Sequence, residues 1–132
     1  MIALYPTKAQ IETLLASPES GPVTMLNLLR FKERASAPDD DATGREAYQR
    51  YATKMRGLVE GRGGRFLWIG RIDSQVMGEG AENFHVAAIV EYPSRKAFVE
   101  IATSPEVTAI GVHRAAGLEG QWLLATTTTK GE

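Results

Sequence analysis

Histidine is the side chain whose unperturbed pKa lies closest to neutral pH, and this 132-residue sequence contains two, His85 and His113. His113 has helical spacing from apolar neighbours and precedes Arg114, whose planar guanidinium suits a carboxylate or an enolate. We therefore predict that His113 transfers a proton and that Arg114 binds the anionic end of a ligand. Alternatively, His113 hydrogen-bonds the last carbonyl groups of a helix. His85 is interpreted as a solvent contact at a strand end.

Asn27 is a polar residue inside the apolar run Val23–Phe31. A buried carboxamide without partners costs about 1–3 kcal/mol, so Asn27 must be hydrogen-bonded. By strand parity it shares a face with Met25 and Leu29. We predict that Asn27 lines a pocket and polarises a ligand carbonyl. The alternative is a core residue that binds a neighbouring backbone group.

Two aromatic residues are candidate walls of the same pocket. Trp68 shares strand parity with Phe66, and its indole N–H can donate one hydrogen bond. Tyr51 lies on the apolar stripe of an amphipathic segment and could donate a hydrogen bond into the pocket. Both are also explained as core aromatic residues. If the two surround a pocket with Asn27 and His113, the polar groups lie at one end of an apolar site.

Composition excludes other chemistries. The absence of cysteine rules out disulfides, thiolate zinc sites and iron–sulfur clusters, and the two histidines lack metal-ligand spacing, so no metal is expected. Fifteen Lys and Arg against 16 Asp and Glu leave a net charge of -1, which does not favour nucleic acid. With no signal peptide and no apolar run long enough for a membrane span, we predict a cytoplasmic protein without a membrane partner.

Capping signals and hydrophobic spacing define the elements that position these residues. Capping boxes at Thr7 and Thr43 predict a short helix to about Ala16 and a long amphipathic helix to Gly61 or Gly63-Gly64. Strands are predicted at 23–31, 65–71 with an extension to 77, 84–92 and 121–128, and further helices at 95–102 and from Ser104 to Gly117. We expect a β-bulge at Gly70. The acidic loop Ala35–Thr43 is interpreted as a solvated turn.

This order, a helix followed by β-α-β-β-α-β, predicts an α+β, ferredoxin-like fold with a four-stranded antiparallel sheet and two helices on one face. We expect one domain over 1–132, with an N-terminal helical extension at 1–21, a core at 22–128 and a tail at 129–132. The strands at 23–31 and 84–92 are apolar on both faces, but the helices cover only one. We therefore predict a homodimer that packs sheet on sheet.

Several short motifs follow one another along the chain: Pro22-Val-Thr-Met-Leu-Asn-Leu-Leu-Arg-Phe31, Gly44-Arg-Glu-Ala-Tyr48, Gly63-Gly-Arg65, Glu91-Tyr-Pro-Ser-Arg95 with Ala97-Phe98, and Ser104-Pro-Glu106 followed by His113-Arg114. Together, and in this order, they resemble an uncharacterised domain family of the dimeric α+β barrel superfamily. The resemblance spans roughly residues 22 to 128 and implies a ferredoxin-like fold and a back-to-back dimer. The wider superfamily includes cofactor-independent monooxygenases, lactone isomerases and haem-degrading enzymes, and a shared fold does not assign a reaction.

Three functions are consistent with these observations. The first is a cofactor-independent enzyme, isomerase-like or monooxygenase-like, that acts on a small apolar carbonyl or aromatic compound. Asn27 and His113 would be its catalytic residues, and Arg114, Trp68 and Tyr51 would bind the substrate. The second is a haem-binding or haem-degrading protein with His113 as the axial ligand, because haem-degrading relatives in the superfamily use the same residue types, Asn, Trp and His. The third is a dimer that binds a ligand without catalysis.

Overall fold

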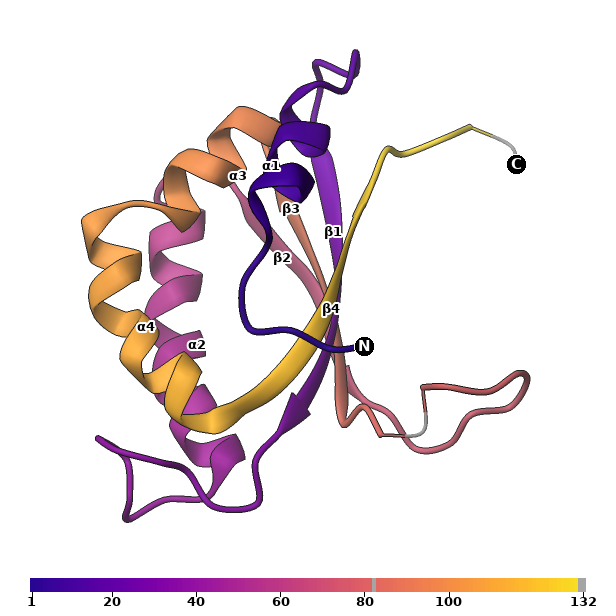
Figure 1. Cartoon of the computed structure of the whole chain (residues 1–132). Helices are drawn as coiled ribbons and strands as arrows, with labels where there is room; N and C mark the ends of the chain where they lie inside the picture. The colour runs from indigo at the N-terminus through magenta and orange to yellow at the C-terminus, as the bar shows by residue number, and fades with distance from the viewer. Residues whose placement is uncertain (82, 131–132) are drawn as a thin grey trace.

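The structure, a computed structural model, describes residues 1–81 and 83–130 and contains one four-stranded antiparallel sheet in the order β2-β3-β1-β4. The elements are α1 (Lys8–Leu15), β1 (Val23–Phe31), α2 (Gly44–Glu60), β2 (Arg65–Arg71), β3 (Val86–Tyr92), α3 (Arg95–Ala102), α4 (Pro105–Gly117) and β4 (Leu118–Thr126). Helices α2, α3 and α4 cover one face of the sheet (Figure 1). The predicted α+β, ferredoxin-like order is confirmed. In the described part of the chain, no helix is long and apolar enough to cross a membrane.

Helix starts follow the predicted capping signals. The Thr7 and Thr43 hydroxyls each accept a hydrogen bond from the third helical amide. The side chains of Gln10 and Glu46 accept the backbone N–H of Thr7 and Thr43, so both capping boxes are complete. Ser104 caps α4, and Pro105 follows at the first turn. In contrast to α2, α1 contains no buried residue, so it adds little to the core.

The core lies between the helices and the odd-numbered side chains of β1. Val23, Met25, Leu29 and Phe31 are buried there, and the even-numbered residues of β3 pack beside them. From α2, Tyr51, Met55 and Val59 contact this layer. Asn27 lies in the middle of the buried row of β1, as strand parity predicts.

The β-bulge lies at Leu67 and not at Gly70. Phe66 pairs with Val90, but Trp68 pairs with Ile89, so β2 contains one extra residue between them. The extra residue turns Trp68 onto the sheet face opposite to Phe66, which makes the predicted common face wrong. A Cβ atom on Gly70 would lie 2.4 Å from Trp68 Cζ2, so glycine leaves room for the indole. Strand β2 ends at Arg71 and does not extend to Met77.

The acidic loop Ala35–Thr43 is partly buried, contrary to the prediction of a solvated turn. Asp39 is only 2% exposed, and Ala35 and Ala42 are buried. The loop closes on itself through Ala35 N–H to Ala42 O, and Ser36 N–H donates to Ala116 O at the end of α4. Short side chains and these backbone hydrogen bonds pack the loop against the helices, whereas Asp40 and Asp41 stay exposed.

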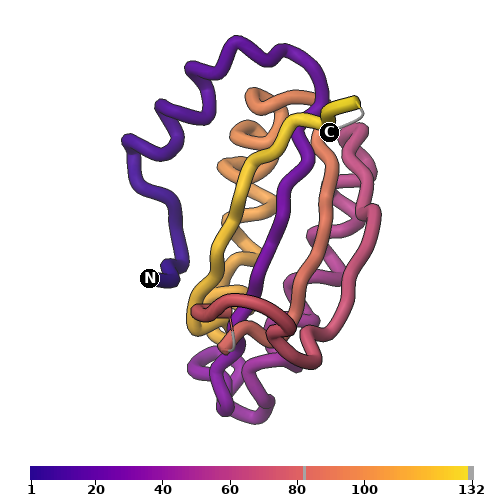
Figure 2. The backbone as a smooth tube through the Cα atoms, turned by 90° about the vertical axis from the view of Figure 1, so that its right-hand side faces the viewer, coloured from indigo at the N-terminus to yellow at the C-terminus, as the bar shows by residue number. Residues whose placement is uncertain are grey.

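Within the described residues, no helix covers the second face of the sheet, which we call the open face (Figure 2). Cross-strand pairing places on it the apolar side chains of Leu26, Leu28, Trp68, Ala87, Ile89, Trp122 and Leu124. Trp68 is 54% exposed there. Single apolar residues are common on protein surfaces, but a contiguous apolar patch of this kind indicates an interaction surface.

Candidate functional site

A cavity of about 70 Å³ lies between the sheet and α2. Its polar side chains are Asn27 from β1, Tyr48 and Tyr51 from α2, and Tyr92 from β3; apolar residues of the same elements and of β2 complete it. This volume accommodates a few water molecules or a ligand group of a few heavy atoms. The cavity therefore has the position and lining of a small-molecule site.

The three tyrosine hydroxyl groups at this cavity make no hydrogen bond to any other residue that the structure describes. The rings of Tyr48 and Tyr51 are close, with centroids 5.4 Å apart. Burial raises the pKa of Tyr48, Tyr51 and Tyr92 above the usual range, so all three remain protonated at neutral pH. The cavity thus contains three O–H donors that are free to bind a ligand.

A chain of hydrogen bonds fixes the orientation of the Asn27 carboxamide. The Arg114 guanidinium carries only hydrogen-bond donors, so its Nη2 donates to Gln121 Oε1 at 2.8 Å. Gln121 must then turn its Nε2 toward Asn27, and it donates to Asn27 Oδ1 at 3.3 Å. Asn27 Nδ2 keeps only long contacts, 3.4 Å to Met25 O and 3.5 Å to Ala88 O. Asn27 therefore offers a donor to the cavity, because its oxygen is already occupied.

Arg114 supports this arrangement from outside the cavity. Its guanidinium lies 5.5 Å from the centroid of the Tyr5 ring, and Ala3 exchanges two backbone hydrogen bonds with Gln121 at the edge of β4. The positive charge of Arg114 also partly offsets the upward shift that burial causes in the pKa of Tyr48 and Tyr51. The N-terminal segment and α4 together hold the group that orients Asn27.

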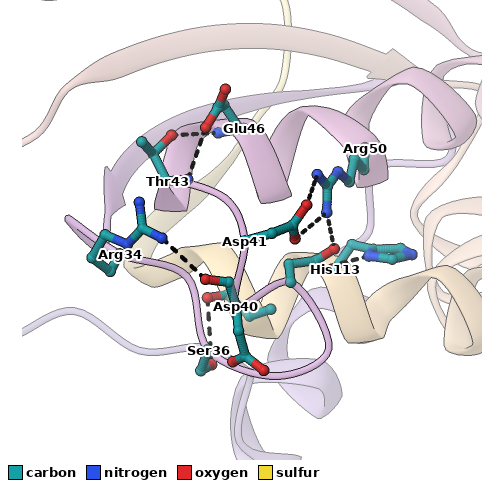
Figure 3. Close-up of polar contacts among 10 residues, drawn as sticks. Arg34, Ser36, Asp40, Asp41, Thr43, Glu46, Arg50 and His113 are labelled. Atoms are coloured by element: carbon teal, nitrogen blue, oxygen red, sulfur yellow. Dashed lines mark hydrogen bonds and ion pairs between the residues drawn. The ribbon is translucent and has the colours of Figure 1, made fainter.

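His113 lies outside the cavity, bound to the acidic loop (Figure 3). Its Nδ1 is 2.7 Å from Asp39 Oδ2, and Arg50 of α2 contacts the other carboxylate oxygen of Asp39 and also Asp41. The hydrogen bond with His113, followed by that with Arg50, lowers the pKa of Asp39. His113 therefore connects α4 to the loop that precedes α2.

The predicted convergence of Asn27, Trp68 and His113 is wrong. Asn27 lines the cavity with Tyr51, Trp68 lies on the open face, and His113 contacts the acidic loop. The bulge at Leu67 turns the Trp68 indole to the other face of the sheet. The buried carboxylate of Asp39, far away in sequence, fixes the position of the His113 imidazole. Arg114 acts on the cavity only through Gln121.

Three residues of the site were not among the sequence candidates for it. Tyr48 lies three positions before Tyr51, and this helical spacing predicts that both face the same side of α2. Tyr92 pairs with Val23 at the end of β3, so parity with the buried row of that strand would have found it. No local sequence pattern pointed to Gln121, because its hydrogen bond to Asn27 depends on the pairing of β4 with β1.

The residues present do not fit a haem group. The cavity is far smaller than a porphyrin, and His113, the proposed axial ligand, is not among its lining residues. Asn27 lines the cavity, Trp68 lies on the open face and His113 contacts the acidic loop, so within the described residues these three side chains form no common haem pocket. Among the described residues, no group of three or more His, Asp or Glu side chains is arranged to hold a metal ion.

Lowering the pH is expected to weaken the contact of the acidic loop. Because the folded-state pKa of Asp39 is lowered from its ordinary 3.8, its contribution to stability is complete above that value. The contribution is lost as the pH falls through the folded-state pKa. Asp39→Asn should therefore lower Tm at pH 7 and flatten the acid-side decrease of Tm in thermal unfolding. Asp40→Asn, at an exposed neighbouring carboxylate, is the control, and equal Tm profiles for the two variants would contradict this role.

The sheet order and the one-sided helical layer define a ferredoxin-like α+β protein with a small internal cavity between the sheet and α2. The chain belongs to the DUF1330 family, described as a domain of unknown function, whose model matches residues 39–128. A protein of unknown function from Rhodopseudomonas palustris has a crystal structure with 34% identity and a TM-score of 0.88, covering 98% of this chain and 99% of that one. No curated protein matches the sequence.

More distant solved structures share the fold. A dimeric ferredoxin-like protein of unknown function from Thermobifida fusca has 14% identity and a TM-score of 0.56, covering 86% of this chain and 96% of that one. SnoaB, a cofactor-independent oxygenase from Streptomyces nogalater, has 15% identity and a TM-score of 0.50, covering 86% of this chain and all 100% of that one. The resemblance to an uncharacterised family with this fold is confirmed, and at these identities the likeness extends to the fold alone.

Proposed function

We propose that this protein binds a small apolar carbonyl compound between the sheet and α2 and stabilises the oxyanion of its enolate. The observation that carries the proposal is the composition of the polar wall, which consists of donors: Asn27 Nδ2 and the hydroxyls of Tyr48, Tyr51 and Tyr92. A carbonyl or enolate oxygen is an acceptor, so it complements these groups, and the apolar remainder of the cavity suits a hydrocarbon body.

This donor set suggests a particular kind of chemistry. Because their pKa is raised, the tyrosine hydroxyls stay protonated at neutral pH and do not act as bases. Among the described lining residues none carries a carboxylate or an imidazole. The cavity would therefore lower the pKa of a bound carbon acid and release the proton to water. An enolate formed in this way is an intermediate for isomerisation or for reaction with oxygen, which agrees with a cofactor-independent isomerase-like or monooxygenase-like enzyme.

Acetylacetone, a small apolar diketone, is expected to bind with a lowered pKa, because the donors favour its enolate. Tyr51→Phe removes one donor and keeps the ring, so it should weaken enolate binding about tenfold. The appearance of the enolate absorbance, measured over a pH series with the protein in excess, tests this. Tyr5→Phe is the matched control, because it removes a tyrosine hydroxyl outside the cavity and keeps the ring that contacts Arg114. An unchanged acetylacetone pKa in the intact protein would overturn the proposal.

A ligand-binding protein without catalysis is the second candidate, and the small size of the cavity favours it. Such a protein would bind the diketone and lower its pKa but would not accelerate exchange of the α-hydrogens with deuterated water. An exchange rate at least about a hundredfold above that of buffer, and reduced in Tyr51→Phe, would support the enzyme. The cytoplasmic location and the lack of a nucleic-acid partner, both expected from composition, stay predictions.

We also propose that the protein works as a homodimer in which two open faces pack together. The apolar open face is continuous across all four strands of the sheet. The segment between β2 and β3 projects on the same side (Figure 1) and carries Val76 and Met77, which are almost fully exposed. The dimeric protein from Thermobifida fusca has the same fold, which supports this assembly.

Leu124→Lys should convert the dimer to a monomer of 14.4 kDa at micromolar concentration, because the substitution places a charge within an apolar interface. Sedimentation velocity measures the mass. Leu15→Lys is a closely matched control, since Leu15 and Leu124 are both 48% exposed and Leu15 lies on α1, away from the sheet. A wild-type protein that sediments as a monomer, or two variants with the same mass, would contradict the proposed interface.

A further inference from the structure

A second concave site, about 580 Å³ in volume, lies where β1 ends and α2 begins, and we call it the β1-end groove. Phe31, Arg45 and His85 line it, together with the cations Arg30 and Lys32, the acids Glu33 and Glu119, and Thr43. None of its lining residues lines the cavity described above. Phe31 separates the two sites, since its ring centroid is 5.3 Å from that of Tyr48, which belongs to the cavity.

The imidazole of His85 has a fixed tautomer in the β1-end groove. Its Nδ1 accepts the backbone N–H of Phe31 at 3.0 Å, so this nitrogen carries no proton. The neutral ring must therefore carry its proton on Nε2. The imidazole also stacks parallel to the Phe31 ring, at 5.8 Å and 5°. His85 is exposed just before β3, as predicted for a solvent contact at a strand end, and it presents one N–H donor in a defined direction.

Arg45 is the cation of this groove with unused donors. Its guanidinium lies over the Phe31 ring at 5.0 Å, and it makes no ion pair with any acid that the structure describes. By contrast, Arg30 pairs with Glu119 at 3.0 Å, and Lys32 donates to Ser36 Oγ and to the Ala115 carbonyl. An arginine fork held by an aromatic ring and without a carboxylate partner is suited to bind a carboxylate in two parallel hydrogen bonds.

Backbone contacts make the floor of the groove rigid. Lys32 N–H donates to Gly117 O at 2.9 Å, and Gly44 N–H donates to Glu33 O at 3.4 Å. These bonds connect the end of β1 to the first turn of α2 and to the last turn of α4. Phe31 itself is 8% exposed and packs in the core. The donors of Arg45 and His85 are therefore held on one buried ring, and little ordering is needed when a ligand binds.

We propose that the β1-end groove binds the carboxylate of a small organic acid, with the Arg45 fork on both oxygens and His85 Nε2–H on one of them. Glu33 and Glu119 also line the groove and disfavour ligands of higher negative charge, such as phosphate. This site is independent of the carbonyl site, because the two share no lining residue.

Titration with benzoate at constant ionic strength, followed by NMR of the His85 and Arg45 side-chain nitrogens, tests this proposal. Saturable shifts of both groups are expected, with phosphate binding at least about tenfold more weakly. Arg45→Gln should weaken benzoate binding at least about tenfold, and His85→Phe, which keeps the stacked ring, should weaken it severalfold. Arg56→Gln is the control, because Arg56 also lies over an aromatic ring, Phe66, but outside the groove.

Three results would overturn the proposal. Equal binding of benzoate and phosphate would show nonspecific attraction of anions. Shifts at Asn27 and Tyr51 in place of His85 would place benzoate in the cavity. Unchanged benzoate affinity in Arg45→Gln, with a Tm equal to that of the wild type, would exclude the guanidinium. None of these results depends on whether acetylacetone binds, so the failure of one site is distinguishable from the failure of the other.

Discussion

Gly44→Ala is expected to lower the free energy of unfolding by more than about 3 kcal/mol, because the new methyl group meets backbone that cannot move away. A Cβ atom at Gly44 would lie 2.0 Å from the carbonyl oxygen of Lys32 and 2.7 Å from that of Gly117. Both oxygens belong to ordered backbone, and the Gly117 oxygen already accepts Lys32 N–H. Relief would require the first turn of α2 to separate from β1 and α4.

The contact between the start of α2 and the end of α4 also requires glycine at position 117. A Cβ atom there would lie 2.2 Å from Gly44 O and 2.7 Å from Tyr48 N. The two glycines thus allow the start of α2 to contact the end of α4 directly. Tyr48 and Tyr51 follow in the next two turns of α2, so this contact also positions two of the donors in the cavity.

Gly57→Ala is the matched control for Gly44→Ala. Gly57 lies inside the same helix, and nothing is within 4 Å of its Cβ position. Alanine there should raise the free energy of unfolding by about 0.5–1 kcal/mol, because it restricts the unfolded chain and favours the helix. Urea unfolding followed by circular dichroism measures both variants. Midpoints that shift in the same direction would contradict the proposed backbone contact.

Local signals predicted the fold because they act over a few residues. The capping boxes at Thr7 and Thr43 need only a hydroxyl and an acidic or amide side chain three positions later, and both are present in the structure. Apolar content on both faces of β1 and β3 also predicted an uncovered face. The predicted extension of β2 to Met77 was wrong, because the polar residues Asp73-Ser-Gln75 follow Ile72 and the pairing with β3 ends at Arg71.

The site was less predictable because its geometry depends on pairing between distant segments. Parity placed Asn27 on the buried face, but one extra residue at Leu67 reversed the face of Trp68. Asp39 belongs to a run of three aspartates that is typical of solvated turns, and only the approach of α4 buries its carboxylate against His113. A sequence pattern does not reveal the register between strands, nor the contact between Asp39 in the loop and His113 in α4, 74 positions later.

Gln121→Glu is expected to turn the Asn27 carboxamide around and to reverse the ligand preference of the cavity. Both oxygens of the new carboxylate are acceptors, so one can keep the hydrogen bond from Arg114 while the other faces Asn27. Asn27 Oδ1, now 3.3 Å from Gln121 Nε2, would be repelled there, and the amide would present Nδ2 instead. Its current contacts through Nδ2 are long, at 3.4 and 3.5 Å, so they oppose the rotation weakly.

After this rotation, Asn27 would offer an acceptor to the cavity. Binding of the acetylacetone enolate should weaken at least about tenfold, while the neutral enol, whose hydroxyl can donate, should lose less affinity. Nuclear Overhauser contacts of the Asn27 amide protons report the rotation without any ligand: they should move from Met25 and Ala88 to the side chain at position 121. Gln49→Glu adds the same charge on an exposed turn of α2 and serves as the control. If Asn27 keeps its orientation in Gln121→Glu, the Arg114–Gln121 pair does not determine whether Asn27 Nδ2 or Oδ1 faces the cavity. If Asn27 rotates and enolate binding is unchanged, Asn27 does not contact the ligand oxygen.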